Sequence, residues 1–219
     1  MTECVLLAAG RGERFAAGAG TGAGARAGAG AGLPGGRQLK PLAPFRGEPL
    51  ILHGLRNALA ACVRCVVVTG YGAQSITPVI AGIERVTVVY NEHFDRGMVW
   101  SIACGLEAVE QPLAFIAPAD MPALHPNIYQ TLQGVALGEQ SSHPVAYMPV
   151  FQERQGHPVL VHTALRDDLR RALEGTAQKG TDPPGSMRAF LQRYPVQEIP
   201  VQTDAILWDI DTPEELARG

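Results

Sequence analysis

Apolar runs with strand character alternate with segments of helical periodicity along the first half of this chain, and this alternation constrains its fold most. The run 4–9 leads into a glycine, which is typical of a buried strand followed by a loop. The same criteria predict further strands at 66–69, 85–90 and 113–117, and helices at 51–62, 76–83 and 98–109. Because parallel strands need crossover connections, the pattern predicts an α/β fold: a single-domain three-layer sandwich with a mostly parallel sheet and helices on both faces.

The periodicity is weaker beyond residue 122. It predicts helices at 127–135, 164–174 and 187–193, and strands at 145–150, 159–162, 197–201 and 205–209. Thr212 and Pro213 are typical of the N-cap and first turn of a last helix. Since no period repeats and no linker divides the chain, we expect one domain over residues 1–219.

Residues 16–36 differ in composition from the rest of the chain. This tract holds nine Gly, eight Ala and one Pro among its residues, so it has almost no side chains with which to form a core. We expect a flexible insertion here.

The charge balance argues against a nucleic-acid-binding protein, because 18 Lys and Arg oppose 21 Asp and Glu, a formal net charge of −3. No uninterrupted apolar stretch reaches about 18 residues, the length a transmembrane helix needs. The first apolar run follows an acidic residue and is closed by Arg11, the wrong order for a secretory signal. Four cysteines are too few for a disulfide scaffold, so we expect a cytoplasmic protein.

A glycine-rich loop follows the first strand. Its sequence, Gly10-Arg11-Gly12-Glu13-Arg14-Phe15, lacks the third glycine of a dinucleotide fingerprint and the Gly-Lys-Ser/Thr of a P-loop. Backbone N–H groups in such a loop can still cradle an anion. From the loop alone, a phosphate site and a plain tight turn are equally open.

Six short motifs, in constant order over residues 4–216, carry a resemblance to a known family. They are Leu7-Ala8-Ala9-Gly10-x-Gly12-x-Arg14; Lys40-Pro41-Leu42 with Gly47-x-Pro49-Leu50; Gly97-Met98-x-x-Ser101-Ile102; Pro118-Ala119-Asp120-Met121-Pro122; Gly156-His157-Pro158-Val159-Leu160; and Asp209-Ile210-Asp211-Thr212-Pro213-Glu214. The chain resembles the nucleotidyltransferase superfamily and, within it, the molybdenum cofactor cytidylyltransferases.

The resemblance implies a Rossmann-like sheet of the nucleotide-diphospho-sugar transferase type and a Mg²⁺-dependent reaction. CMP would pass from CTP to the terminal phosphate of molybdopterin, with release of pyrophosphate, and a client molybdenum enzyme would be a further partner. The pair Ala8-Ala9 resembles the cytidylyl branch, whereas the guanylyl branch usually has Gly at the second position.

The resemblance also implies roles for individual residues. Arg14, Lys40 and Asp120 take catalytic positions, and Asp120 with Asp211 or Asp209 takes the metal positions. The nucleotide would bind Leu7, Ala8, Ala9, Gly10, Gly12, Arg14, Lys40 and Ser101, and the acceptor would bind Gly156, His157, Asp182 and Arg188.

The chemistry of the reaction agrees with these residue types. A phosphate oxygen that attacks an α-phosphorus needs no side-chain nucleophile; it needs charge repulsion removed and the line of attack fixed. Arg14 and Lys40 supply positive charge, and Asp120, after an apolar strand, offers an oxygen ligand for Mg²⁺. Asp209 and Asp211 point the same way in an extended stretch, so the sequence does not choose between them.

Each of these residues also has a structural interpretation. Asp120 is typical of a turn, Ser101 of a helix N-cap, and His157 of a Gly-His-Pro turn. Asp211 or Thr212 is suited to capping the final helix.

The cysteine and histidine spacings favour no metal site. Cys62 and Cys65 form a single Cys-x-x-Cys pair without a second one, so we interpret them as structural cysteines. The other histidines share no ligand spacing; they are His53, His93, His125, His143 and His162.

Two departures from the family pattern leave alternatives open. The insertion puts 26 residues between Arg14 and Lys40, and the family's Gly-Asp-x-Gly-x-Arg segment is matched only loosely around Asp182 and Arg188. One alternative is transfer from CTP or GTP to another phosphorylated acceptor, such as a sugar phosphate, a phosphorylated alcohol or an isoprenoid precursor. Another is a non-catalytic nucleotide-binding chaperone that delivers the cofactor.

Overall fold

A central sheet of mixed strand direction organises the protein. The computed structural model describes residues 1–13, 15, 38–138, 145–179 and 185–218. In the sheet the strands follow the order β10 (Val196–Pro200), β7 (Ala146–Phe151), β9 (Val159–His162), β6 (Leu113–Pro118), β1 (Glu3–Ala8), β4 (Arg64–Thr69) and β5 (Val86–Tyr90), with β8 (Arg154–Gln155) paired to β7. The pairings β6–β1, β1–β4, β4–β5 and β10–β7 are parallel, and β9 runs antiparallel to both of its neighbours.

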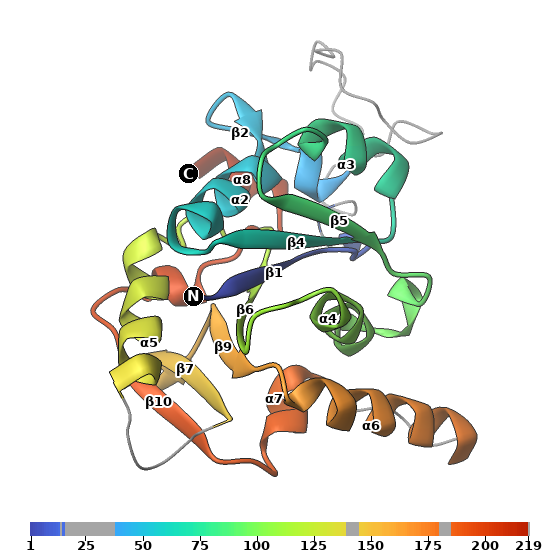
Figure 1. The fold of residues 1–219 in the computed structure, drawn as a ribbon. Coiled ribbons are helices and arrows are strands. Elements are labelled where there is room, and N and C mark those ends of the chain that lie inside the picture. Colours follow the sequence, from blue (N-terminus) through green and yellow to red (C-terminus); the bar gives the residue numbers. More distant parts are fainter. Residues whose placement is uncertain (14, 16–37, 139–144, 180–184, 219) are drawn as a thin grey trace.

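Helices cover both faces of this sheet, which confirms the predicted three-layer α/β sandwich (Figure 1). On one face lie α2 (Leu50–Ala61), α3 (Ala73–Ile80) and α5 (Pro126–Gly138); on the other lie α4 (Met98–Glu107), α6 (Leu165–Lys179) and α7 (Met187–Leu191). Alternate residues of β1 divide between the two cores: Cys4 and Leu6 join the first, and Val5 joins the second. None of the helices within the described ranges is long and apolar enough to cross a membrane.

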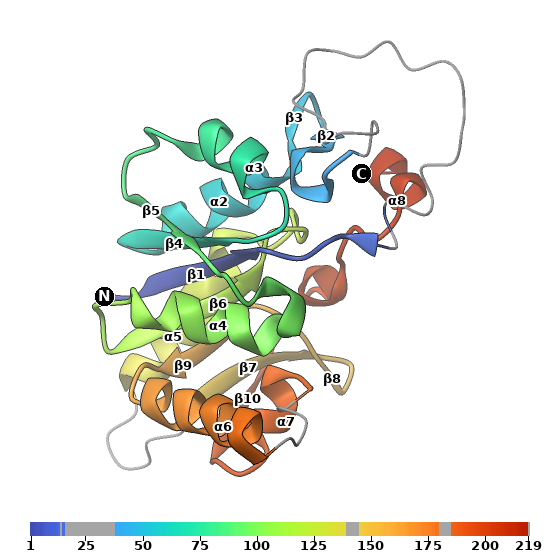
Figure 2. The same ribbon diagram turned by 90° about the vertical axis from the view of Figure 1, so that its right-hand side faces the viewer.

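A third, smaller cluster lies beside the sheet. The hairpin of β2 (Pro44–Phe45) and β3 (Glu48–Pro49) lies next to α8 (Pro213–Arg218), as Figure 2 shows. Phe45, Leu50 and Ile210 are buried together there, and Trp208 and Leu216 pack against them. This cluster holds the C-terminal segment against the part of the chain that precedes α2.

One predicted strand is wrong. Residues 205–207 fall in a 3-10 helix, η3 (Asp204–Leu207), and residues 208–209 pair with no strand. The Thr203 hydroxyl accepts a hydrogen bond from the Ala205 N–H at 3.2 Å, so a local cap competes with the extended conformation. The last helix begins as predicted, because Thr212 Oγ1 accepts from the Glu215 N–H and the Glu215 carboxylate accepts from the Thr212 N–H.

An ion pair fixes the sheet at the N-terminal end of β1. The Glu3 side chain is 2% exposed, and its Oε1 lies 2.9 Å from Arg64 Nε. The other carboxylate oxygen, Oε2, accepts a hydrogen bond from the Glu110 N–H at 2.8 Å. Because this pair lies at the start of β1, it stabilises the end of the sheet opposite to the loop that follows β1.

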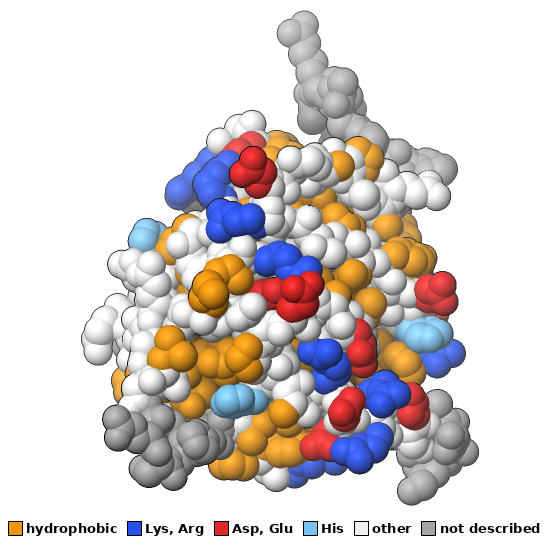
Figure 3. Space-filling view, viewed as in Figure 1, with side chains coloured by type: hydrophobic (Ala, Val, Ile, Leu, Met, Phe, Trp, Pro, Cys, Tyr) orange, Lys and Arg blue, Asp and Glu red, His pale blue; other side chains and the backbone are white. Residues whose placement is uncertain are grey.

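Surface charges are mixed in sign on the face drawn in Figure 3. Lys and Arg side chains lie close to Asp and Glu side chains there, with apolar patches between them. This distribution agrees with the small net charge and shows no extended basic surface on that face.

Candidate functional site

A cleft of about 530 Å³ opens where β1 and β6 end. It brings together nine residues that the sequence analysis selected: Leu7, Ala8, Ala9, Gly10, Gly12, Lys40, Ser101, Asp120 and Asp211. Because β1 and β6 are parallel, the loops that follow them leave the sheet at the same edge. Clefts at this edge of open α/β sheets are the usual position of ligand sites.

The loop after β1 is fixed by backbone hydrogen bonds to its neighbours. The Leu7 carbonyl accepts from the Ala119 N–H at 3.0 Å, and the Ala9 carbonyl accepts from the Tyr71 N–H at 3.1 Å. Gly12 has a φ of +57°, and a Cβ placed on it would lie 3.2 Å from Lys40 Cβ. A side chain at position 12 would therefore strain the backbone and press against the lysine.

Lys40 connects two acidic residues at the floor of the cleft. It begins the 3-10 helix η1 (Lys40–Leu42), and its side chain is 9% exposed. Its Nζ lies 2.6 Å from Asp120 Oδ2 and 2.7 Å from Asp211 Oδ1. Burial lowers the pKa of Lys40, but the two carboxylates outweigh that effect and raise the pKa above its ordinary value, so the ammonium stays charged at neutral pH.

The backbone places Asp211 rather than Asp209 in the cleft. The Ile210 N–H donates to the Asp120 carbonyl at 3.0 Å, and the Asp211 N–H donates to Glu215 Oε2 at 2.7 Å. Asp209 does not line the cleft, although partial desolvation, with the carboxylates of Asp211 and Asp120, raises its pKa. The Thr212 hydroxyl caps the helix, and Asp211 lines the cleft.

Asp120 and Asp211 both offer carboxylate oxygens, which are the ligands that a hard divalent cation prefers. Asp120 Oδ1 is buried and has no hydrogen-bond partner within the described part of the chain. The described residues contain no group of three or more His, Cys, Asp or Glu side chains that could hold a metal ion. Two carboxylates without further protein ligands fit Mg²⁺, which is usually bound by one or two carboxylates, water and substrate phosphates.

Ser101 lies within α4 and faces the cleft while being 4% exposed. The N-cap of α4 is Gly97, and Ser101 follows four residues later, inside the helix, so the interpretation of Ser101 as the cap is wrong. Its Oγ lies 3.0 Å from Nδ2 of Asn91.

Sequence reasoning missed the residues at the rim of the cleft. The Arg11 guanidinium carbon lies 5.7 Å from the ring centre of Tyr71 and 5.8 Å from that of Phe94. Arg11 and Phe94 also line the cleft. The position of Arg11 between two glycines of the loop was the available signal, but its aromatic partners are distant in the sequence.

Three of the residues assigned to the acceptor, Gly156, His157 and Arg188, do not line the cleft. A Cβ on Gly156 would lie 2.2 Å from the Ile206 carbonyl oxygen, so this glycine permits close packing against η3. The His157 N–H donates to the same carbonyl at 2.9 Å. Burial lowers the pKa of His157, whereas a hydrogen bond to the Ile116 backbone and the charge of Asp120 raise it less strongly. Arg188 is exposed in α7.

Two of the predicted site residues, Arg14 and Asp182, lie outside the described residues, as does the 16–36 tract. Their assigned roles stay predictions.

The Cys-x-x-Cys pair is part of the core. Cys62 and Cys65 are buried free thiols, and burial raises the pKa of Cys62 to about 12. A thiol with so high a pKa is a poor nucleophile and a poor metal ligand at neutral pH, in agreement with a structural role.

A glycine loop at the end of β1, a lysine between two carboxylates and a Rossmann-like sheet together define an enzyme of the nucleotidyltransferase class. The chain belongs to the family of MobA-like NTP transferase domains, whose model matches residues 4–197.

Individual relatives agree with this family. The molybdenum cofactor cytidylyltransferase of Escherichia coli strain K12 is 24% identical over 178 residues, 81% of this chain and 85% of that protein. A molybdenum cofactor guanylyltransferase of Burkholderia vietnamiensis strain G4 is 26% identical over 182 residues, 78% of this chain and 82% of that protein. A solved structure of a nucleotidyl transferase from Methanothermobacter thermautotroptrophicus has a TM-score of 0.73 at 21% identity and covers 100% of this chain and 95% of its own; it shows the fold.

Proposed function

We propose that this enzyme transfers CMP from CTP to the terminal phosphate of molybdopterin and releases pyrophosphate. The observation that carries the proposal is the position of Lys40 between Asp120 and Asp211 at the floor of a cleft whose wall is the glycine loop. The family to which the chain belongs includes relatives named for transfer to the molybdenum cofactor.

Phosphate binding follows from the charges and donors of the cleft. The loop around Gly10 and Gly12 presents backbone N–H groups, and Lys40 supplies a cation. The resemblance adds Arg14 on the same loop. Together these groups neutralise the triphosphate, so that an acceptor phosphate can approach the α-phosphorus without full charge repulsion.

Nucleotidyltransferases of this family generally use a divalent metal. We propose Mg²⁺ here, with Asp120 and Asp211 as the residues that hold it; when bound, it would withdraw negative charge from the phosphate oxygens. Lys40 would then exchange part of its contact with the two carboxylates for the triphosphate.

The choice of base rests on a different set of residues of the cleft. Ala8, Ala9 and Ser101 line it, and Ala9 stands where the guanylyl branch usually has glycine. A methyl group at this position narrows the space beside the base, which favours a pyrimidine over a purine. The relatives include enzymes named for each of the two bases, so guanylyl transfer is the direct alternative.

The acceptor is proposed from the resemblance around Gly156, His157, Asp182 and Arg188. Transfer to another phosphorylated acceptor uses the same triphosphate site and is the second candidate. A non-catalytic chaperone for the cofactor would bind nucleotide without turnover. We place the activity in the cytoplasm, where free thiols such as those of Cys62 and Cys65 persist.

A pyrophosphate-release assay tests these alternatives. Each of the four nucleoside triphosphates is offered with and without molybdopterin, in Mg²⁺ and after chelation. The proposal expects repeated turnover with CTP, at least about tenfold faster than with GTP, only when molybdopterin and Mg²⁺ are present. Turnover with a different phosphorylated acceptor alone contradicts the molybdopterin proposal, and binding without turnover identifies a chaperone.

A further inference from the structure

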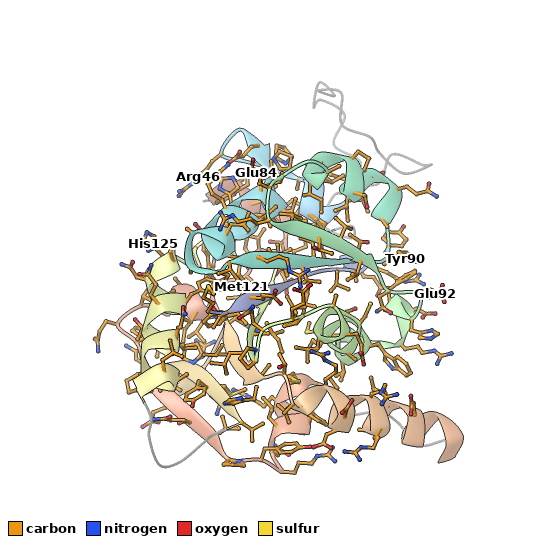
Figure 4. All side chains as sticks on the ribbon, in the orientation of Figure 1. Arg46, Glu84, Tyr90, Glu92, Met121 and His125 are labelled. Carbon is orange, nitrogen blue, oxygen red and sulfur yellow. The ribbon has the colours of Figure 1, made fainter. Side chains whose placement is uncertain are left out.

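Asn91 is a buried amide immediately behind the cleft that no site prediction used. It follows β5 directly, is 4% exposed and does not line the cleft. Figure 4 labels its two neighbours in the sequence, Tyr90 and Glu92, near the end of β5. Among the described residues, the Asn91 side chain is linked to the cleft through its hydrogen bond with Ser101.

Two backbone hydrogen bonds fix the orientation of the Asn91 side chain. The Asn91 N–H donates to the Thr69 carbonyl at 2.9 Å, which continues the β4–β5 pairing past the last residue of β5. Its Oδ1 accepts from the His93 N–H at 2.9 Å. A backbone N–H can only donate, so the amide oxygen must face His93 and the amide NH₂ must face Ser101.

This orientation determines the polarity of the Ser101 hydroxyl. Because Nδ2 is a donor without a lone pair, Ser101 Oγ accepts the hydrogen bond at 3.0 Å and keeps its own proton. Within the described part of the chain, Ser101 Oγ makes no other hydrogen bond. The hydroxyl proton is therefore available to an acceptor in the cleft.

We infer that Asn91 is a positioning residue that makes Ser101 a hydrogen-bond donor toward the base and thereby selects a ring nitrogen that carries a lone pair. Cytosine has such a nitrogen at N3 on its pairing edge. Uracil carries a proton at N3 and guanine carries one at N1. Ser101 could accept from either only with its second lone pair, which turns its own buried proton away from the ring, where no described residue accepts it. The inference rests on the proposed nucleotide site and adds the means by which that site distinguishes CTP from UTP, a base of equal size.

The decisive variant reverses the polarity with little change in shape. In Asn91→Asp, one carboxylate oxygen still accepts from the His93 N–H, and the other can only accept from Ser101. The Ser101 hydroxyl then donates inward and presents its lone pairs to the cleft. The added negative charge weakens all triphosphates alike, so the readout is the ratio of dissociation constants for CTP and UTP.

The experiment is calorimetric titration of CTP, UTP and GTP with Mg²⁺, without acceptor, at pH 8, where the new carboxylate is ionised. For the wild type we expect CTP to bind at least about tenfold more tightly than UTP. Asn91→Asp should lower that ratio by about tenfold or more. Asn91→Ala, which frees the Ser101 hydroxyl to rotate, should give an intermediate ratio of dissociation constants. This variant tests the inference on its own if Asn91→Asp does not fold.

Ser101→Ala is the matched control for a role through the hydroxyl. In the Ser101→Ala background, Asn91→Asp should leave the CTP to UTP ratio unchanged, because the group that it reverses is gone. An equal loss of ratio in both backgrounds, or an unchanged ratio in folded Asn91→Asp and Asn91→Ala, overturns the inference. A wild type that prefers GTP contradicts the proposed base instead, so the two failures are distinguishable.

Discussion

The ammonium nitrogen of Lys40 lies 2.6 Å from Oδ2 of Asp120, while Oδ1 of the same carboxylate is buried without a hydrogen-bond partner among the described residues. The two oxygens of Asp120 thus differ: one is neutralised by the protein, and the other is left for a ligand that the protein does not supply. A buried carboxylate oxygen without a partner is costly unless a cation or a donor completes it.

Replacement of Asp120 by Asn should lower turnover by about 10²-fold or more and leave the fold intact, because the amide removes the negative charge that the proposed metal needs. Steady-state pyrophosphate release measures the turnover, and circular dichroism checks that the variant is folded. Asp211→Asn should behave in the same way, whereas Asp209→Asn should have a much smaller effect. Wild-type turnover in folded Asp120→Asn contradicts the metal assignment.

Gly12→Ala should weaken triphosphate binding by roughly tenfold, since a φ of +57° costs an alanine about 1–2 kcal/mol and its Cβ would press on Lys40. Gly10→Ala is the matched control, because a Cβ there meets nothing within 4 Å. Calorimetric dissociation constants for CTP test the pair. Equal losses in the two variants would contradict this explanation, because only the Gly12→Ala side chain contacts Lys40.

Glu3→Gln should lower the free energy of unfolding by about 3 kcal/mol, since it leaves Arg64 without its buried partner. Activity measured at low temperature should be unchanged, because the pair lies at the end of β1 far from the glycine loop. The control is Glu48→Gln: its partner Arg56 is 63% exposed, so the loss should stay below about 1 kcal/mol. Urea unfolding compares the two, and equal losses would argue against this ranking.

Burial lowers the pKa of His157 in the folded protein below its ordinary value of 6.5. As the pH falls through 6.5, the unfolded chain takes up a proton that the folded chain does not, so His157 should reduce stability progressively from pH 7 toward pH 5. Thermal unfolding of His157→Gln should show a shallower loss over that window than the wild type. The exposed His125, changed to Gln, should leave the wild-type slope in place.

Strands that are buried on both faces were predictable because they leave an uninterrupted apolar run. Val66, Val67 and Val68 of β4 have no exposed surface, and the sequence shows this directly. The β2–β3 hairpin was missed, since strands of two residues carry no periodicity. The wrong strand at 205–209 came from an apolar run whose conformation is decided by the Thr203 cap.

The site was predictable where motifs carry it and not where distant contacts decide it. Lys40 and Asp120 were chosen from their motifs, although 80 residues separate them in the chain. The choice between Asp209 and Asp211 depends on the hydrogen bond from Ile210 to the Asp120 backbone, which no local pattern encodes. Asn91 was missed because its neighbours in the sequence resemble an ordinary turn.

That hydrogen bond from Ile210 also has a consequence for synthesis of the protein. It joins the last segment of the chain to the end of β6, and it delivers Asp211 to a cleft whose other walls come from residues 7–120. A nascent chain can therefore pair β1 with β4 and β6 while its later residues are still on the ribosome, yet it cannot complete the charged floor of the cleft. The enzyme gains its full site only after residue 211 has emerged and closed over it.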